Sequence, residues 1–94
     1  MTTTHSYVST PGEILLEEFL EPMGISQYKL AHAIHKPQSA ISEIVNGHRA
    51  ITTEMAWLLS RALGTTPDFW LSLENTYQIK TFDLSNMPQV AALG

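Results

Sequence analysis

A small set of hydrogen-bonding side chains recurs along one edge of a helix predicted between residues 37 and 46. With about 100° between successive residues of a helix, the polar members fall within about 100° of one another: Gln38, Ser39, Ser42 and Asn46. The apolar members lie on the opposite side: Ala40, Ile41 and Ile44. A glutamine amide can bond to adenine N6 and N7 together, and serine hydroxyls can bond to several base edges. Such a helix can enter a DNA major groove while its back packs on a small core.

A second predicted helix precedes this one and is joined to it by a tight corner. Ser26 can cap its start, and its inner residues are Leu30, Ala31 and Ile34. A small residue such as Ala31 lets two helices cross closely. His35 occupies the corner position where a glycine is usual, so we expect a left-handed or strained backbone there, or a slightly different turn geometry. The two helices together predict a helix-turn-helix.

The groups flanking this unit are suited to phosphates. Gln27 begins the second helix and can offer its amide and the helix N-terminus to a phosphate. Lys36, His48 and Arg49 flank the recognition helix, which begins at about Pro37, and can hold the DNA backbone. The predicted DNA-binding set is therefore Gln27, Lys36, Pro37, Gln38, Ser39, Ser42, Asn46, His48 and Arg49.

Composition allows one domain with a core of its own. The chain has 94 residues, of which 44% are hydrophobic and 15% charged, and it has no cysteine. This excludes disulfides and thiolate metal sites. No apolar run approaches the roughly 18 residues that span a bilayer, and the N-terminus lacks a secretory pattern. We expect a cytoplasmic protein without membrane contact.

Charge is unevenly distributed along the chain. The net charge is −4, which at first disfavours a nucleic-acid partner. Residues 26–49 carry three cations against one acid, or +2, and the remainder carries two cations against eight acids, or −6. The only positive region therefore coincides with the predicted helix-turn-helix.

Three further helices complete an all-α, five-helix fold. Thr10, Pro11 and Glu13 predict a capped helix that runs to about Leu20, with Pro22 and Gly24 ending it. Another begins at Thr52 or Thr53 and should bury four residues: Met55, Leu58, Leu59 and Ala62. The last begins at 66–68 and reaches about 79–82. Residues 1–9 and 84–94 are predicted tails around a domain at 10–83.

The last helix is apolar on two sides. One stripe contains Phe69, Trp70, Leu73 and Tyr77, and another side carries Leu71, Ile79 and Phe82. A domain this small has too little protein to cover both sides. We expect Leu71, Ile79 and Phe82 to form a homodimer interface, which would place two recognition helices about 34 Å apart. The alternative is a C-terminal tail that folds back over this side.

Other groups favour no catalytic chemistry. His32 and His35 lack converging acidic partners for a metal, and the row Glu13, Glu17 and Glu21 reads as a solvated helix face. Trp57 should be partly exposed, either stacked on Arg61 or anchoring a partner. We expect no cofactor, no metal and no enzymatic activity.

Three blocks in order carry a resemblance to a known family. They are TPGEILLEEFLEPMGISQ at 10–27, NGHRAITTEMA at 46–56 and LGTTPDFWLSLE at 63–74. They resemble HigA-type antitoxins of the Xre family, whose fold is the five-helix, lambda-repressor-like domain. In that family Gln27, Gln38, Ser39 and Ser42 match DNA-contact positions, and Arg49 matches the block that follows the recognition helix.

The resemblance implies a dimeric repressor that binds a palindromic operator in its own promoter. It also implies an antitoxin that neutralises a RelE/HigB-like, mRNA-cleaving toxin. Two alternatives stay open: a stand-alone helix-turn-helix regulator without a toxin partner, and a toxin-masking module with weak DNA binding, which the overall acidity would suit.

Overall fold

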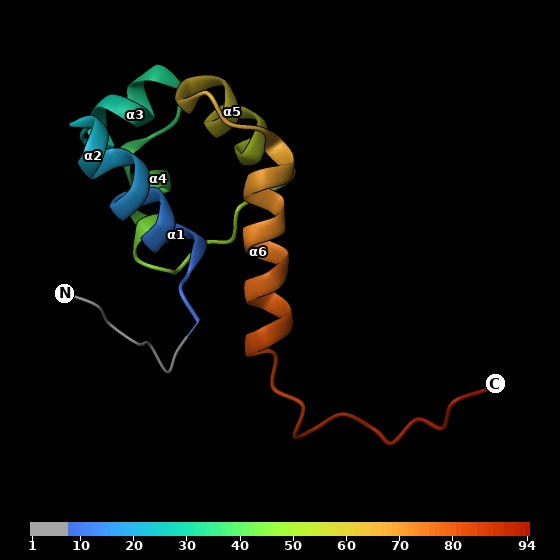
Figure 1. The fold of residues 1–94 in the computed structure, drawn as a ribbon. Coiled ribbons are helices and arrows are strands. Elements are labelled where there is room, and N and C mark those ends of the chain that lie inside the picture. The colour runs from blue at the N-terminus through green and yellow to red at the C-terminus, as the bar shows by residue number, and fades with distance from the viewer. Residues whose placement is uncertain (1–7) are drawn as a thin grey trace.

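The computed structural model describes residues 8–94, which form helices and no strand (Figure 1). The first helix is continuous but has three segments, α1 (Pro11–Ile14), the π-helical η1 (Leu15–Leu20) and α2 (Glu21–Met23). It is followed by α3 (Gln27–Ala33), α4 (Gln38–Val45), α5 (Thr53–Leu63) and α6 (Pro67–Thr81). The predicted all-α, five-helix class is confirmed.

The first helix starts as predicted and ends later. Thr10 and Glu13 form a reciprocal capping box, in which each side chain accepts the other residue's backbone N–H. The sequence predicts an end near Leu20, yet the helix continues through Pro22 to Met23. The intervening turn is π-helical, so the Glu21 N–H donates to the Leu16 carbonyl. Pro22 has no N–H and so cannot donate a hydrogen bond to the preceding turn. This missing bond comes directly after the wider turn, and the helix continues past it.

Side-chain caps begin the later helices. Ser26, Thr52 and Thr66 each accept a backbone N–H from the residue three positions on. Gly24 and Gly64 end their helices in the left-handed region, with φ of 67° and 75°.

One apolar core joins all five helices. Its fully buried members include Trp70, Leu15, Leu20, Ile41, Ile44 and Leu59. The Trp70 indole N–H donates to the Thr65 hydroxyl over 2.7 Å, so its one polar atom is satisfied. α3 packs on α4, α5 packs on α6, and the N-terminal turn α1 contacts both α4 and α6. The recognition helix is therefore held from behind by other elements.

The buried side of α5 differs in part from the prediction. Met55 and Leu59 are buried and Leu58 is half-buried, but Ala62 is exposed. Ala56, Ser60 and Leu63 are buried instead. The inward stripe is thus rotated, and it tolerates Ser60 because that hydroxyl donates to the Trp57 carbonyl over 2.8 Å.

α6 continues past the bundle, and the chain after it stays extended (Figure 1). Every residue from Gln78 to Gly94 is exposed. The predicted alternative, a tail folded back over α6, is therefore not seen. Ile79 and Phe82 are 69% and 60% exposed, while Leu71 is half-buried against the core. No helix of the described residues is both long and apolar enough to cross a membrane.

Candidate nucleic-acid interface

The corner between α3 and α4 adopts the backbone that the sequence predicts. His35 has φ of 60°, the one positive φ among non-glycine residues in the described part of the chain. The Lys36 N–H bonds back to the Ala31 carbonyl over 3.0 Å, which closes the turn. Ala31 itself is buried at the crossing of the two helices. A residue with a β-carbon in this region carries strain that a glycine would not.

α4 presents its polar edge outward. Ala40, Ile41 and Ile44 are at most 5% exposed and hold the helix to the core. Gln38, Ser39 and Asn46 are exposed, and Ser42 is half-buried. Pro37 precedes the helix as an exposed N-cap residue that gives no side-chain cap, and its carbonyl accepts the Ala40 N–H over 3.0 Å. The face expected to meet bases is open in a single copy.

A hydrogen bond links α3 to this polar edge. The Ser42 hydroxyl donates to the Gln27 Oε1 over 2.8 Å. The Gln27 oxygen is thereby engaged as an acceptor, so this hydrogen bond leaves the two N–H donors of the Gln27 amide for a different partner, such as a phosphate. Ser42 in this arrangement offers its lone pairs, so it can accept from a base amino group. The two side chains are thus held together by a hydrogen bond. The sequence did not predict this pair, because the two residues are 15 positions apart.

The helix N-terminus of α3 is less available than predicted. Ser26 Oγ accepts the Lys29 N–H over 3.0 Å, which occupies one of the free donors of the first turn. The predicted phosphate contact at this end would therefore depend on the Gln27 side chain more than on the backbone.

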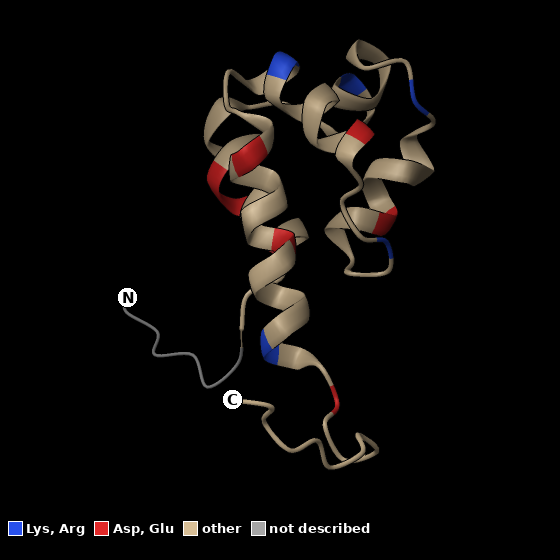
Figure 2. Ribbon diagram, turned by 90° about the vertical axis from the view of Figure 1, so that its right-hand side faces the viewer, with Lys and Arg blue, Asp and Glu red and all other residues tan. Residues whose placement is uncertain are grey.

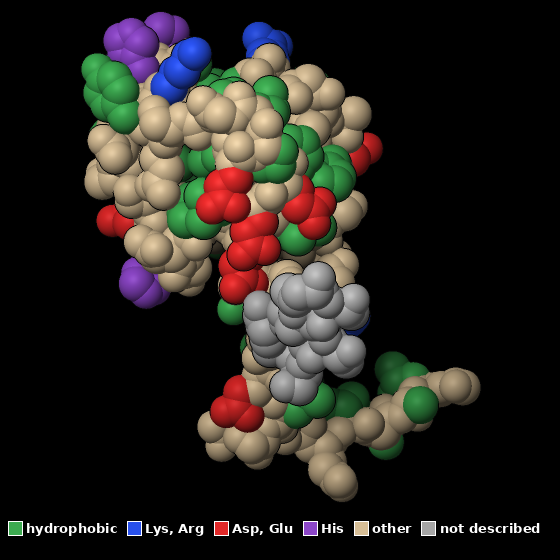
Figure 3. Space-filling model, turned by 60° about the vertical axis from the view of Figure 1, so that its left-hand side comes forward, with side chains coloured by type: hydrophobic (Ala, Val, Ile, Leu, Met, Phe, Trp, Pro, Cys, Tyr) green, Lys and Arg blue, Asp and Glu red, His purple; other side chains and the backbone are tan. Residues whose placement is uncertain are grey.

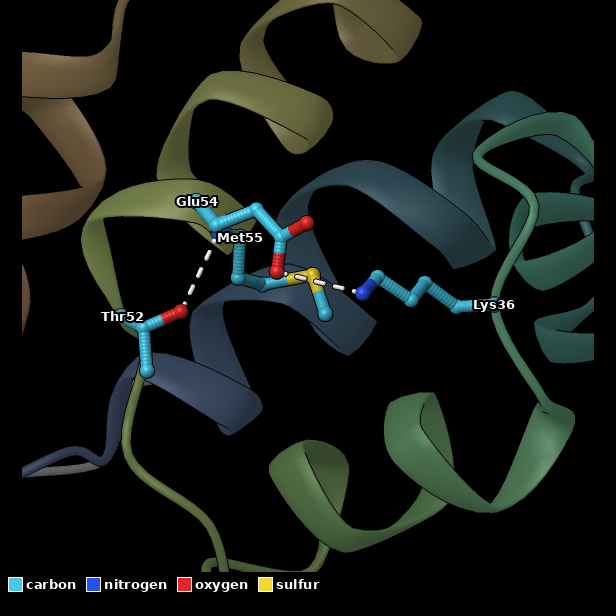
Figure 4. Close-up of polar contacts among 4 residues, drawn as sticks. All are labelled: Lys36, Thr52, Glu54 and Met55. Carbon is cyan, nitrogen blue, oxygen red and sulfur yellow. Dashed lines mark hydrogen bonds and ion pairs between the residues drawn. The ribbon is translucent and has the colours of Figure 1, made fainter.

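Two of the cations predicted to contact the DNA backbone form ion pairs with carboxylates of this chain. Lys36 Nζ lies 3.1 Å from Glu54 Oε1, across from the α3–α4 corner to the first turn of α5 (Figure 4). Arg49 Nε lies 2.8 Å from Glu43 Oε1 on α4. The predicted positive region thus has two of its three cations neutralised by carboxylates. Glu54 lies outside residues 26–49, so the charge count over that range did not include it.

The remaining positive groups are sparse. Lys29 is exposed on α3, beside His32, whose ring stacks on Tyr28 with centroids 6.0 Å apart. His48 is exposed after α4. The space-filling view shows histidine side chains and Lys or Arg side chains at the top of the bundle, another histidine lower down, and acidic side chains gathered on a different part of the surface (Figure 3). Figure 2 shows the basic positions spread over several segments. A DNA surface here rests on shape and hydrogen bonds more than on charge.

Groups predicted to lie outside this surface behave mostly as expected. Glu17 and Glu21 are exposed with Glu18, while Glu13 is taken up by the capping box. Trp57 is 51% exposed, and the Arg61 guanidinium lies 5.9 Å from its ring centroid, which is the stacking alternative of the two that the sequence left open. Residues 8–94 contain no group of three or more potential metal-ligating acids, histidines or cysteines.

A helix-turn-helix with an exposed polar recognition edge is the site that these observations define. Residues 16–70 match the helix-turn-helix family model, which covers the corner and both of its helices. The chain therefore belongs to the helix-turn-helix family of DNA-binding regulators, and its relatives include antitoxins of the HigA type.

Two curated relatives and one solved structure illustrate this membership. The transcriptional regulator YbaQ of Escherichia coli K12, itself uncharacterised, is 44% identical over 66 residues, covering 70% of this chain and 58% of YbaQ. Antitoxin HigA-1 of Vibrio cholerae serotype O1 is 41% identical over 68 residues, covering 72% and 64%. The structure of Pseudomonas aeruginosa antitoxin HigA with the higBA promoter aligns with a TM-score of 0.76 at 36% identity, covering 79% and 80%. The chain thus matches about three fifths of the length of the two curated relatives.

Proposed function

We propose that this protein is a homodimeric repressor that reads a palindromic operator through the outer edge of α4. The observation that carries the proposal is the pairing of Gln27 with Ser42 beside exposed Gln38 and Ser39. In this arrangement α3 supplies a phosphate contact at a fixed offset from the base-reading groups. The HigA structure with promoter DNA supports the same use of the fold.

Gln38 has the leading role in base recognition. It is the first residue of α4 and is exposed, and its amide can bridge N6 and N7 of one adenine. Ser39 and Ser42 read neighbouring edges. Lys36, His48 and Arg49 would contact the DNA backbone, with Pro37 and Asn46 at the two ends of the recognition helix.

Binding to the DNA upstream of its own gene tests this proposal. Fluorescence anisotropy should show that Gln38→Ala weakens specific binding by roughly tenfold, because a bidentate pair contributes about 1–3 kcal/mol of discrimination. Binding to random DNA should be unchanged, and the circular dichroism spectrum should match that of the parent protein. Equal operator affinity of the two proteins would refute the assignment.

We infer further that the protein is the antitoxin of a toxin–antitoxin pair, regulating its own operon and neutralising an mRNA-cleaving, RelE/HigB-like toxin. The likeness to HigA-1 of V. cholerae supports this inference. The exposed acidic face on the first helix suits a basic ribonuclease. Expression of a short basic neighbouring reading frame should arrest growth, and co-expression of this chain should restore it. Continued arrest would leave the stand-alone regulator as the function.

One observation favours a second candidate, a toxin-masking module with weak DNA binding. Lys36 and Arg49 are both engaged by carboxylates of the chain itself. Few cations are then free to release counterions from DNA, so the salt dependence should be shallow. An operator dissociation constant no tighter than that for random DNA would support this candidate over the repressor.

A further inference from the structure

The chain beyond α6 forms an apolar arm that packs against no other described part of the same copy. We define the C-terminal arm as residues 82–94. Its large apolar side chains recur every two or three residues and are 50–104% exposed: Phe82, Leu84, Met87, Val90 and Leu93. Five such side chains on an extended segment form an apolar surface that a lone folded protein seldom presents to water.

The arm has defined local structure at its root. The hydroxyl and the N–H of Ser85 both donate to the Asp83 carboxylate, which lowers the pKa of Asp83. The Met87 N–H bonds to the Leu84 carbonyl over 3.1 Å in the following turn. These contacts lead the chain away from the bundle, and the arm projects from the end of α6 (Figures 1 and 2).

The same molecule holds an open apolar groove that the arm does not fill. The α1–α6 groove has a volume of about 570 Å³ and runs along α6 from Asp68 to Tyr77. Its apolar lining consists of Val8, Ile14, Phe69, Leu73 and Tyr77. Phe69 is 37% exposed there although its ring packs against Phe19 and Trp70.

We propose that the two copies of a dimer exchange their C-terminal arms. The arm of each copy lies in the α1–α6 groove of the other. The proposal rests on the homodimer proposed above and names how its two chains are joined. In a two-fold dimer each patch meets the complementary patch of the partner, so both exposed surfaces are covered at once.

The dimensions permit this exchange. Residues 84–94 span up to roughly 36 Å when extended at about 3.3 Å per residue. The ten residues of α6 from Asp68 to Tyr77 span only about 15 Å at 1.5 Å per residue. The arm also begins at the expected interface, because Ile79, Phe82 and Leu84 line one continuous apolar hollow at the end of α6. If this hollow forms the dimer interface, the arm starts beside the partner chain.

Cysteine crosslinking tests the exchange, since the natural chain has no cysteine. A tagged chain carrying Val90→Cys is mixed with an untagged chain carrying Thr76→Cys, which places one thiol on the arm and one at the rim of the groove. Mild oxidation should give a disulfide-linked species of one tagged and one untagged chain. The matched control replaces Thr76→Cys with Glu18→Cys on the acidic face of the first helix, and it should give less than a tenth of that product.

Three results would overturn the proposal. A disulfide within one chain that carries both Val90→Cys and Thr76→Cys would show that the arm folds onto its own groove. Equal crosslinking to Glu18→Cys would show a free arm. Absence of crosslinks would show that the arm enters the groove of neither copy.

Sedimentation separates this proposal from the dimer on which it rests. A chain ending at residue 83 should dissociate at a concentration at least tenfold higher than the full chain, with an unchanged circular dichroism spectrum. If both chains dimerise equally and no crosslink forms, arm exchange is wrong and the homodimer stands. If the full chain is monomeric at every concentration, both proposals fall.

Discussion

Individual side chains of the proposed DNA-binding surface form hydrogen bonds and ion pairs with other residues of the same chain. Ser42 holds Gln27, Glu54 holds Lys36 and Glu43 holds Arg49. The first contact leaves the Gln27 amide donors for the proposed phosphate contact, whereas the other two pair cations that a phosphate would need. Exposed ion pairs contribute little to stability, about 0–1 kcal/mol. Their larger effect here is on binding, because a DNA phosphate must displace a carboxylate that lies on the same molecule.

Removing one of these carboxylates should strengthen DNA binding. Glu54→Gln frees Lys36, so the affinity for random DNA should rise a few-fold and the slope of log K against log salt should steepen by up to about 0.9. Glu17→Gln is the matched control, because it removes the same charge from the acidic face without freeing a cation. If the two variants change the slope equally, net charge alone sets the affinity and the Lys36–Glu54 pair has no part in it.

Elements position these residues through a few close contacts that the local pattern does not reveal. A β-carbon built on Gly12 would lie 1.8 Å from the Ile44 carbonyl oxygen, so α1 sits directly against the end of α4. The sequence predicted Gly12 only as part of a helix start. It also predicted the buried face of α4 correctly, because Ala40, Ile41 and Ile44 follow helical spacing.

Contacts between elements were the part that could not be predicted. Gln27 and Ser42 are 15 residues apart and Lys36 and Glu54 are 18 apart, and neither separation follows from any helical period. The π-helical turn at Leu15–Leu20 also has no signal in the apolar spacing. The sequence predicts a helix end near Leu20 because Pro22 is taken as a stop, whereas the structure keeps Pro22 within the helix. The left-handed corner at His35 was predictable, since a tight turn between two helices demands a positive φ.

The α3–α4 corner offers a stability test at this scale. His35→Gly should stabilise the protein by roughly 0.5–1 kcal/mol. Replacing a residue that has a β-carbon relieves about 1–2 kcal/mol of left-handed strain, and the greater freedom of glycine in the unfolded chain offsets only part of that gain. The midpoint of thermal unfolding should rise by a few degrees. His35→Ala keeps the β-carbon and removes the imidazole, so its midpoint should not rise. A gain in His35→Ala equal to that in His35→Gly would trace the effect to the ring and not to the backbone.

At the scale of the whole molecule, the core of the helical bundle is buried, but the end of α6 extends beyond the bundle and exposes apolar side chains. The core is closed around Trp70, yet α6 runs past it and ends in Ile79 and Phe82, both exposed. A palindromic operator requires two recognition helices in fixed register. The end of α6 is the surface where the chain has apolar area to contribute to such a pairing.

Dimer formation and operator binding should therefore fail together. Ile79→Ser should weaken self-association by at least tenfold in sedimentation and lower the affinity for a full palindrome, while binding to an isolated half-site stays the same. Lys80→Ser, at the adjacent and also exposed position, is the matched control and should leave both quantities unchanged. Loss of half-site binding in Ile79→Ser would mean that the fold, and not the pairing, had been damaged.

The most direct test of the account asks whether Gln38 contacts an adenine in the major groove. Operator affinity is measured for the parent protein and for Gln38→Ala while each adenine in turn is replaced by 7-deazaadenine, which lacks the N7 acceptor. We predict one symmetric pair of positions at which the parent protein loses roughly tenfold in affinity and Gln38→Ala loses nothing. An equal loss for both proteins at every position would contradict the claim that the outer edge of α4 reads DNA through this side chain.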